Sequence, residues 1–305
     1  MAGSLTRSEG IALGLLLNRV FGSVPSRGDI AATFRGWGNK AADRVGADPA
    51  WTGALAAVAG TGAAVAMGPA LRSMAVATAA ATADQSAQRE GRLASQQLAI
   101  GDLQAAARTV EELSGRSLLE VTPGSVSRLA IETVASDAVT NLVAPALWAG
   151  VGGAAGLGGY KLARRADFLV GRSSGAQGPA LISQIDDIAL WLPARLTALL
   201  VAVAKPTKAP AILSALKNGV PADHPAPNLA IAQQAFAAAL DVQLGGDMDQ
   251  MGVQPVLGTG SDPGSQDVEQ ALKLADRMEL LLTGGLLSAS ALRRLGRARG
   301  SRTAK

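Results

Sequence analysis

The chain has 305 residues, of which 48% are hydrophobic, only 3% are aromatic and 36 are glycines. It contains no cysteine and a single histidine, which excludes disulfides and a cysteine nucleophile and argues against a zinc, haem or iron–sulfur site. The net charge of +4 arises in the tail 293–305, whose six basic residues leave the first 292 residues at −2, so the charge does not indicate a nucleic-acid partner.

The first third of the chain combines apolar runs with one amphipathic segment. Residues 10–18 predict a core helix or a re-entrant segment, and no cleavage site of a removed signal peptide follows them. Residues 49–71 are uncharged and number 23, against the roughly 20 that a membrane-spanning helix needs. Residues 101–113 carry apolar side chains at helical spacing and predict an amphipathic helix with Asp102 as its N-cap.

The middle of the chain predicts an amphipathic helix followed by a second membrane helix. The first covers 125–138 and follows a Pro-Gly turn, with Ser125 as the expected N-cap. The second covers 138–160 and is again 23 uncharged residues long. Its glycines follow no strand, so a dinucleotide-binding loop is excluded and Gly152 and Gly156 are interpreted as a packing face for another helix.

The C-terminal third continues the helical pattern. Residues 196–204 are apolar but short, so they would cross a membrane only together with flanking residues. Residues 252–265 are rich in glycine and proline and predict a loop, since the alternating pattern typical of strands is scarce. Residues 265–282 predict an amphipathic helix with an ion pair between Glu269 and Lys273, one turn apart.

The last apolar run, 280–292, leads directly into the basic tail. By the positive-inside rule this order places the C-terminus in the cytoplasm, and the tail 293–305 is expected to be disordered. The sequence therefore predicts an all-α, multi-pass helical membrane protein with amphipathic soluble helices between the membrane segments. Residues 1–292 are expected to form a single domain.

Two groups of charged residues are candidates for chemistry. Asp186 and Asp187 precede an apolar run and Arg195, and such carboxylates suit Mg²⁺ held together with phosphate. The alternative, which the bare pattern favours, is that they stabilise a helix N-terminus. The basic cluster around Asp167 either binds phosphate or a substrate carboxylate, or anchors the preceding membrane helix on its cytoplasmic side, which we favour.

Three further residues have two interpretations each. Glu132 and Asp137 precede the second membrane stretch, where they are either site acids or the point at which the helix leaves water. His224, the only histidine, is either a general acid or base or a residue of a proline-rich turn. The bare sequence favours the turn.

Five blocks, taken in order, resemble the CobD/CbiB family of cobalamin-biosynthesis membrane proteins. They are GDLQAAARTVEELSGR (101–116), RLAIETVA leading to APALW (128–148), GGYKLARRADFLVG (158–171), IDDIALWLPARLT (185–197) and HPAPNLAIAQQAFAAALDVQLGG (224–246). The resemblance covers most of the chain and is strongest from residue 84 to 260. The order and spacing of the blocks are more specific than any single block.

The resemblance implies an amide-forming ligase of the cell membrane. Members of the family attach aminopropanol, or its O-phosphate, to a carboxylate of adenosylcobyric acid. Activation of that carboxylate implies ATP and Mg²⁺ as cofactors. The implied partners are the corrinoid and amine substrates and the lipid bilayer, with a second copy of the chain or other membrane proteins of the pathway as candidate protein partners.

The resemblance also implies site residues at the positions that match family motifs. The catalytic group is Asp186, Asp187, His224 and Glu132, and the substrate-binding group is Asp102, Asp167, Arg195 and Asn228. We assign Asp186 and Asp187 to Mg²⁺ and Arg195 to phosphate. His224 and Asn228 are assigned to the lining of the substrate cleft.

The chain departs from the family pattern at polar positions. Ser136 and Asp137 stand where the family has a glutamate–asparagine pair, Gln233 stands in place of a glutamate, and Arg164 and Arg165 replace an asparagine–threonine pair. These losses support a second interpretation, in which a diverged, non-catalytic homologue serves as a membrane scaffold or binding protein. A transport-associated membrane protein is a third.

Overall fold

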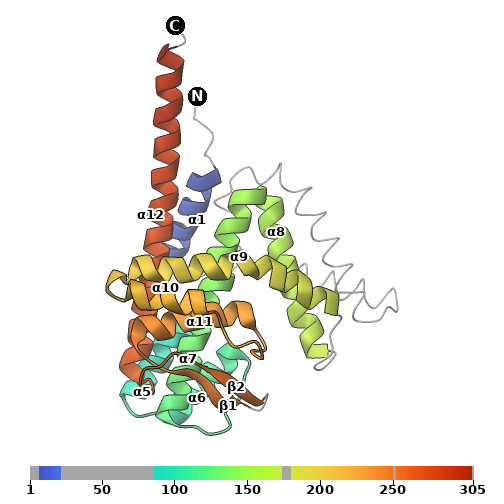
Figure 1. Cartoon of the computed structure of the whole chain (residues 1–305), viewed down its shortest axis with the longest axis vertical. Coiled ribbons are helices and arrows are strands. Elements are labelled where there is room, and N and C mark those ends of the chain that lie inside the picture. The colour runs from blue at the N-terminus through green and yellow to red at the C-terminus, as the bar shows by residue number, and fades with distance from the viewer. Residues whose placement is uncertain (1–6, 22–85, 174–179, 250–251, 304–305) are drawn as a thin grey trace. The chain divides into compact units, whose positions relative to one another are not determined.

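The computed structural model describes residues 7–21, 86–173, 180–249 and 252–303 (Figure 1). Helix accounts for 81% of these residues, in nine helices, which confirms the predicted helical character. The predicted membrane stretch 49–71 lies outside the described residues. The chain forms two compact units.

The second unit holds most of the polar sequence blocks and comprises Asp84–Val143 and Leu190–Leu282. Its elements include α5 (Ser86–Ala99), α6 (Leu103–Ser114), α7 (Pro123–Asp137), the π-helix η1 (Ala138–Val143), the short 3₁₀ helix η2 (Pro206–Lys208), α10 (Ala209–Asn218) and α11 (Pro227–Leu240). The later part of α9 (Ala180–Ala204) and the first part of α12 (Ser265–Thr303) also belong to it. Helix α7 packs against α5, α6 and α11, and Leu129, Ile131 and Phe236 are fully buried in this core.

Local capping explains where the two amphipathic helices begin. Helix α6 starts as predicted, because the Asp102 carboxylate accepts a hydrogen bond from the Ala105 N–H at 3.0 Å. Helix α7 is capped by Thr122 rather than by Ser125, so that prediction was wrong by three residues. The two side chains form a reciprocal capping box, in which each hydroxyl accepts from the backbone N–H of the other residue. Pro123 follows the cap, where a missing N–H costs nothing.

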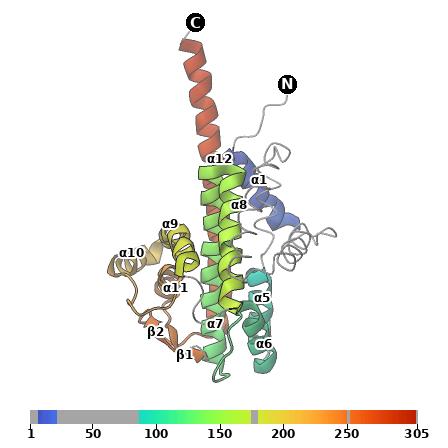
Figure 2. The same ribbon diagram turned by 90° about the vertical axis from the view of Figure 1, so that its right-hand side faces the viewer.

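A short β-hairpin follows α11. Strands β1 (Leu244–Asp249) and β2 (Gly252–Leu257) pair antiparallel with two irregularities in register, beside α7 and α11 (Figure 2). The prediction of a loop over 252–265 is therefore wrong for its first six residues. The sequence of these strands lacks a regular alternating pattern. Two consecutive glycines, Gly245 and Gly246, take positive φ at an irregularity in the register of β1. Pairing and tertiary contacts form the hairpin where local propensity does not indicate it.

The first unit contains α1 (Arg7–Phe21), α8 (Ala144–Ser173), the start of α9 and the end of α12. Helix α8 is broken at Gly153, whose φ of 63° and ψ of −146° are not helical. The predicted membrane helix 138–160 is therefore interrupted. A Cβ on Gly156 would lie 2.3 Å from the Trp148 carbonyl oxygen, whereas one on Gly152 would meet nothing within 4 Å. The close approach at Gly156 is therefore to the earlier half of the same helix, and the face that Gly152 and Gly156 were predicted to offer to another helix stays a prediction.

The basic tail is helical in the structure, in contrast to the expected disorder. Helix α12 continues to Thr303. Arg294 forms an ion pair with Glu9 of α1, and Ser290 shares a hydrogen bond with Ser8. The tail therefore has a specific partner in α1, and the residues just before it have another.

Helix α9 contains a proline whose effect is compensated. Pro193 has no N–H, so the carbonyl of Ala189, one turn earlier, loses its usual helical donor. The Trp148 indole N–H donates to that carbonyl at 3.1 Å. This bond joins two of the family-like blocks, the one ending in APALW and the one beginning IDDIALW.

Two described helices are long and apolar enough to cross a membrane. They are Pro123–Gly153 and Asp187–Ala204, with mean hydropathies of 1.2 and 1.6. The first overlaps the predicted stretch 138–160. The second extends the short run 196–204 by the flanking residues that the prediction required.

The break in α8 can be tested by placing alanine at two neighbouring glycines. Gly153→Ala is expected to lower the free energy of unfolding by about 1–3 kcal/mol, because a Cβ is strained in this backbone conformation. Gly152→Ala is the matched control and should leave the stability unchanged or raise it by up to about 1 kcal/mol. Chemical denaturation of both variants measures the difference, and equal effects would argue against the break.

Candidate functional site

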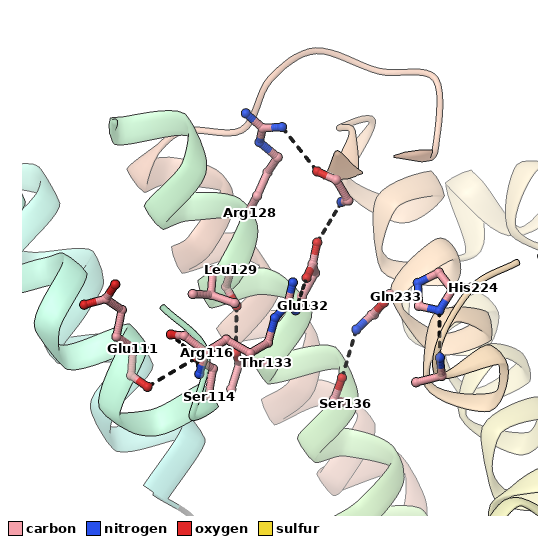
Figure 3. Close-up of polar contacts among 12 residues, drawn as sticks. Glu111, Ser114, Arg116, Arg128, Leu129, Glu132, Thr133, Ser136, His224 and Gln233 are labelled. Atoms are coloured by element: carbon pink, nitrogen blue, oxygen red, sulfur yellow. Dashed lines mark hydrogen bonds and ion pairs between the residues drawn. The ribbon is translucent and has the colours of Figure 1, made fainter. Parts of the chain in front are cut away.

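A buried ion pair lies at the centre of the second unit. The Arg116 guanidinium donates to Oε2 of Glu132 at 2.8 Å, and the two side chains are 18% and 2% exposed. The other carboxylate oxygen, Oε1, accepts from the Gly245 backbone N–H at 2.7 Å. Glu132 thereby joins the α6–α7 connection, α7 and β1 (Figure 3).

The backbone N–H and C=O of Gly245 both bond to side chains of α7. Its carbonyl accepts from the Arg128 guanidinium at 3.2 Å, while its N–H donates to Glu132. A Cβ at Gly245 would lie 2.2 Å from the Pro255 carbonyl oxygen, and its φ is +78°. Only glycine therefore allows β1 to approach both Pro255 and Glu132. Arg128 is also 3.1 Å from an oxygen of Asp262.

A second link joins α7 to α11. The Gln233 side-chain amide donates to the Ser136 hydroxyl at 3.1 Å. Its Oε1 is buried and has no hydrogen-bond partner among the described residues. Arg128, Glu132 and Ser136 are four residues apart, so they lie on one face of α7. That face contacts β1 through its first two members and α11 through the third (Figure 3).

His224 lies just before α11 and is 6% exposed. Its Nδ1 accepts from the Ala226 N–H at 3.1 Å, so the neutral ring carries its proton on Nε2. Nε2 is buried without a hydrogen-bond partner in the part of the chain that the structure describes. Burial lowers the pKa of the ring, the charge of Arg116 lowers it further, and Asp223 opposes both. His224 is therefore a neutral donor close to the Arg116–Glu132 pair.

Three other predicted site residues, outside the predicted metal pair, have side chains that the structure describes. Asn228 is buried in the first turn of α11. Asp102 is exposed and caps α6. Arg195 of α9 stacks on the Trp191 ring at 4.1 Å and donates to the Trp191 carbonyl at 2.8 Å. Glu132 and His224 are thus the predicted residues that meet in one region.

The predicted metal ligands stay a prediction. Asp187 is exposed, and the side chains of Asp186 and Asp167 lie outside the described residues. Among the side chains that the structure describes, no three histidine, aspartate or glutamate groups gather closely enough to hold a metal ion.

Arg116 and Gly245 were not predicted as site residues. A signal for Arg116 was present, because Glu132 lies among the apolar residues of its helix and a buried carboxylate needs a positive partner. Arg116 is the last residue of the family-like block 101–116, which precedes the block that contains Glu132. Gly245 gave no comparable signal, since it bonds through its backbone N–H and lies 113 residues after Glu132 in the sequence.

Comparison with known proteins identifies relatives over most of the chain. The family model described as CobD/Cbib protein matches residues 11–275. Cobalamin biosynthesis protein CobD of Mycobacterium tuberculosis is 32% identical over 291 residues, which cover 88% of this chain and 91% of that protein. The proteins of the same name from Rhodobacter capsulatus and Brucella anthropi are 32% and 34% identical over 186 and 200 residues, which are 59% and 60% of this chain and 59% of each relative. No solved structure matches the chain significantly.

The buried ion pair predicts a large difference between two glutamate variants. Glu132→Gln leaves the Arg116 charge buried without its counter-ion and is expected to cost about 3–5 kcal/mol of unfolding free energy. Glu269→Gln is the control, because its pair with Lys273 is exposed and contributes only about 0.5 kcal/mol or less. Chemical denaturation compares the two, and similar small losses would show that Glu132 is not a central contact.

The single histidine predicts an unambiguous titration. In the folded protein the ring should titrate below its ordinary value of 6.5, with the proton of the neutral form on Nε2. As the pH falls, the unfolded chain takes up this proton first. The contribution of the neutral ring to stability is therefore complete above about pH 6.5 and is lost as the pH falls through the folded pKa.

Nitrogen NMR of histidine-labelled protein reports the pKa and the tautomer directly, since one residue gives all the signal. The same protein unfolded in urea is the reference. A folded pKa at or above the unfolded one, or a neutral form protonated on Nδ1, would contradict the assignment.

Proposed function

The chain belongs to the CobD/CbiB family, and we propose that it acts in cobalamin biosynthesis by attaching aminopropanol, or its phosphate, to a carboxylate of adenosylcobyric acid through an amide bond. One observation above all supports this proposal. Three of the family-like blocks meet in one buried polar cluster, in which Arg116, Glu132 and Gly245 are bonded directly. The family-like blocks are thus joined by specific contacts in the folded chain.

Within this proposal Glu132 is a positioning residue. Both of its carboxylate oxygens are engaged, by Arg116 and by the Gly245 N–H, so it holds β1 and α7 in place rather than reacting. His224 offers an Nε2–H donor, because its Nδ1 is already bonded to Ala226. Gln233 offers a carbonyl oxygen as an acceptor. We assign these two groups to hydrogen bonds with the polar edge of the corrinoid or the amine.

ATP and Mg²⁺ are part of the proposal. Mg²⁺ prefers one or two carboxylates together with phosphate oxygens, and the adjacent Asp186 and Asp187 are chemically suited to it. Asp187 is exposed, so a hydrated ion can reach it. Mg²⁺ would neutralise phosphate charge when it is bound. Arg195, whose guanidinium plane is fixed by its stack on Trp191, is assigned to phosphate.

We place the protein in the cell membrane as a multi-pass protein with a cytoplasmic C-terminus. The exposed apolar side chains of α9 support membrane contact, since Leu192, Leu199 and Val203 are 43%, 43% and 62% exposed on an apolar helix of spanning length. The basic residues of the tail favour the cytoplasmic side.

A specific observation favours a second candidate, a non-catalytic scaffold or binding protein. Ser136 and Gln233 stand at two positions where the family pattern has glutamate, and they bond to each other as a neutral pair. A neutral pair cannot bind a cation or move a proton as two carboxylates can. A member with this change keeps the framework while it loses charged groups.

Complementation of a bacterial strain that lacks the synthase tests the reaction. The wild-type chain should restore cobalamin-dependent growth and cobinamide product. His224→Ala is expected to lower product formation about tenfold through the loss of one hydrogen bond, whereas His224→Gln keeps a donor and should retain more. Glu269→Gln is the control and should behave as wild type, because Glu269 forms an exposed ion pair that is not part of these contacts.

Expression and membrane insertion of each variant are measured in parallel. A well-expressed, inserted wild-type chain that forms no cobinamide product would refute the proposed reaction and support the scaffold.

A further inference from the structure

The second unit contains a pocket that shares no residue with the cluster around Glu132. Its volume is about 90 Å³, and it is lined by Lys205, Leu240, Gln270, Lys273, Leu274 and Arg277. Lys205 directly follows α9, and Leu240 ends α11. The other four residues lie on one face of α12, because their spacing is that of successive helical turns.

Three of the six lining residues are cations. Lys273 is paired with Glu269 at 2.7 Å in an exposed contact. Among the described residues, no carboxylate lies within ion-pair distance of Lys205 or Arg277. Burial lowers the pKa of Lys205, and the charges of Lys208 and Arg277 lower it further, while Asp267 and Asp241 oppose them at longer range. The positive groups therefore repel one another across the pocket, and an anion would relieve that repulsion.

We propose that this pocket binds a phosphate group. A tetrahedral phosphate presents several acceptors to converging donors, and arginine binds two of them at once. The volume is several times the roughly 10–15 Å³ that a cavity needs to hold one water molecule. It is well below the roughly 300–1,000 Å³ of sites that enclose whole small molecules. The pocket therefore suits a phosphate group and leaves the remainder of the ligand outside.

Two sources can present this group. Lys205 follows Ala204, the last residue of the apolar helix Asp187–Ala204, and phospholipid headgroups lie at the ends of membrane-spanning helices. A soluble phosphate compound is the other source. The inference rests on the pocket and its charges and does not depend on the proposed amide-forming reaction.

The test uses the full chain in two preparations. Delipidated protein in detergent is titrated with inorganic phosphate, and phosphorus NMR line broadening measures binding. The same protein is reconstituted into vesicles of phosphatidylglycerol and phosphatidylcholine, and native mass spectrometry measures retained phosphatidylglycerol. Lys205→Gln and Arg277→Gln are each expected to weaken binding about tenfold, which corresponds to one lost charge-assisted bond.

Two further variants separate charge from fold. Arg277→Lys keeps the charge and should retain most of the binding. Lys217→Gln removes an exposed positive charge of α10 outside the pocket and should have no effect. Circular dichroism checks that every variant is folded. Arg277 and Lys217 are exposed, so their substitution is expected to leave the fold intact.

Each outcome decides the question. A loss of phosphate binding in detergent supports the pocket with a soluble source, and a loss confined to phosphatidylglycerol retention supports it with a lipid source. Equal behaviour of Arg277→Gln and Lys217→Gln in both preparations would overturn the proposal.

Discussion

The burial of one carboxylate determines how the second unit is arranged. Glu132 is 1% exposed, and removing a charged group from water is costly unless donors replace the solvent. Its two oxygens take those donors from Arg116, 16 residues earlier, and from Gly245, 113 residues later. Because both bonds require a fixed position of Glu132, the α6–α7 connection and β1 are held on the same part of α7. Arg128 also bonds to the carbonyl of Gly245.

This arrangement bears on which helix is the better membrane candidate. The helix Pro123–Gly153 begins with a polar face that is bonded to protein, and 56% of its apolar window is buried. In Asp187–Ala204 the mean hydropathy is higher and only 44% is buried. Apolarity in the first helix is thus partly explained by the protein core. The exposed apolar side chains of α9 have no such explanation, which makes α9 the stronger candidate.

Local contacts were predictable from the sequence, whereas distant ones were not. The Asp102 cap and the Glu269–Lys273 pair involve residues three or four apart, and the structure contains both. The cap of α7 was misplaced because Thr122 and Ser125 carry the same functional group and each bonds to the backbone of the other. The β-hairpin and the break at Gly153 depend on glycine conformations that a one-dimensional pattern of apolar residues does not reveal.

The candidate site shows the same difference between local and distant contacts. Its paired charges also limit the chemistry that the cluster can perform. Glu132 and His224 were identified from sequence, but their partners were not, since the roles of both depend on Arg116. Within the cluster Arg116 is matched by Glu132, Arg128 by Asp262, and Ser136 by the neutral Gln233. The charged groups of the cluster are thus paired with one another, and its histidine is neutral. The proposed phosphate and metal contacts are therefore assigned outside this cluster, to the exposed Asp187, the partly exposed Arg195 and the cations that line the pocket beside Leu240.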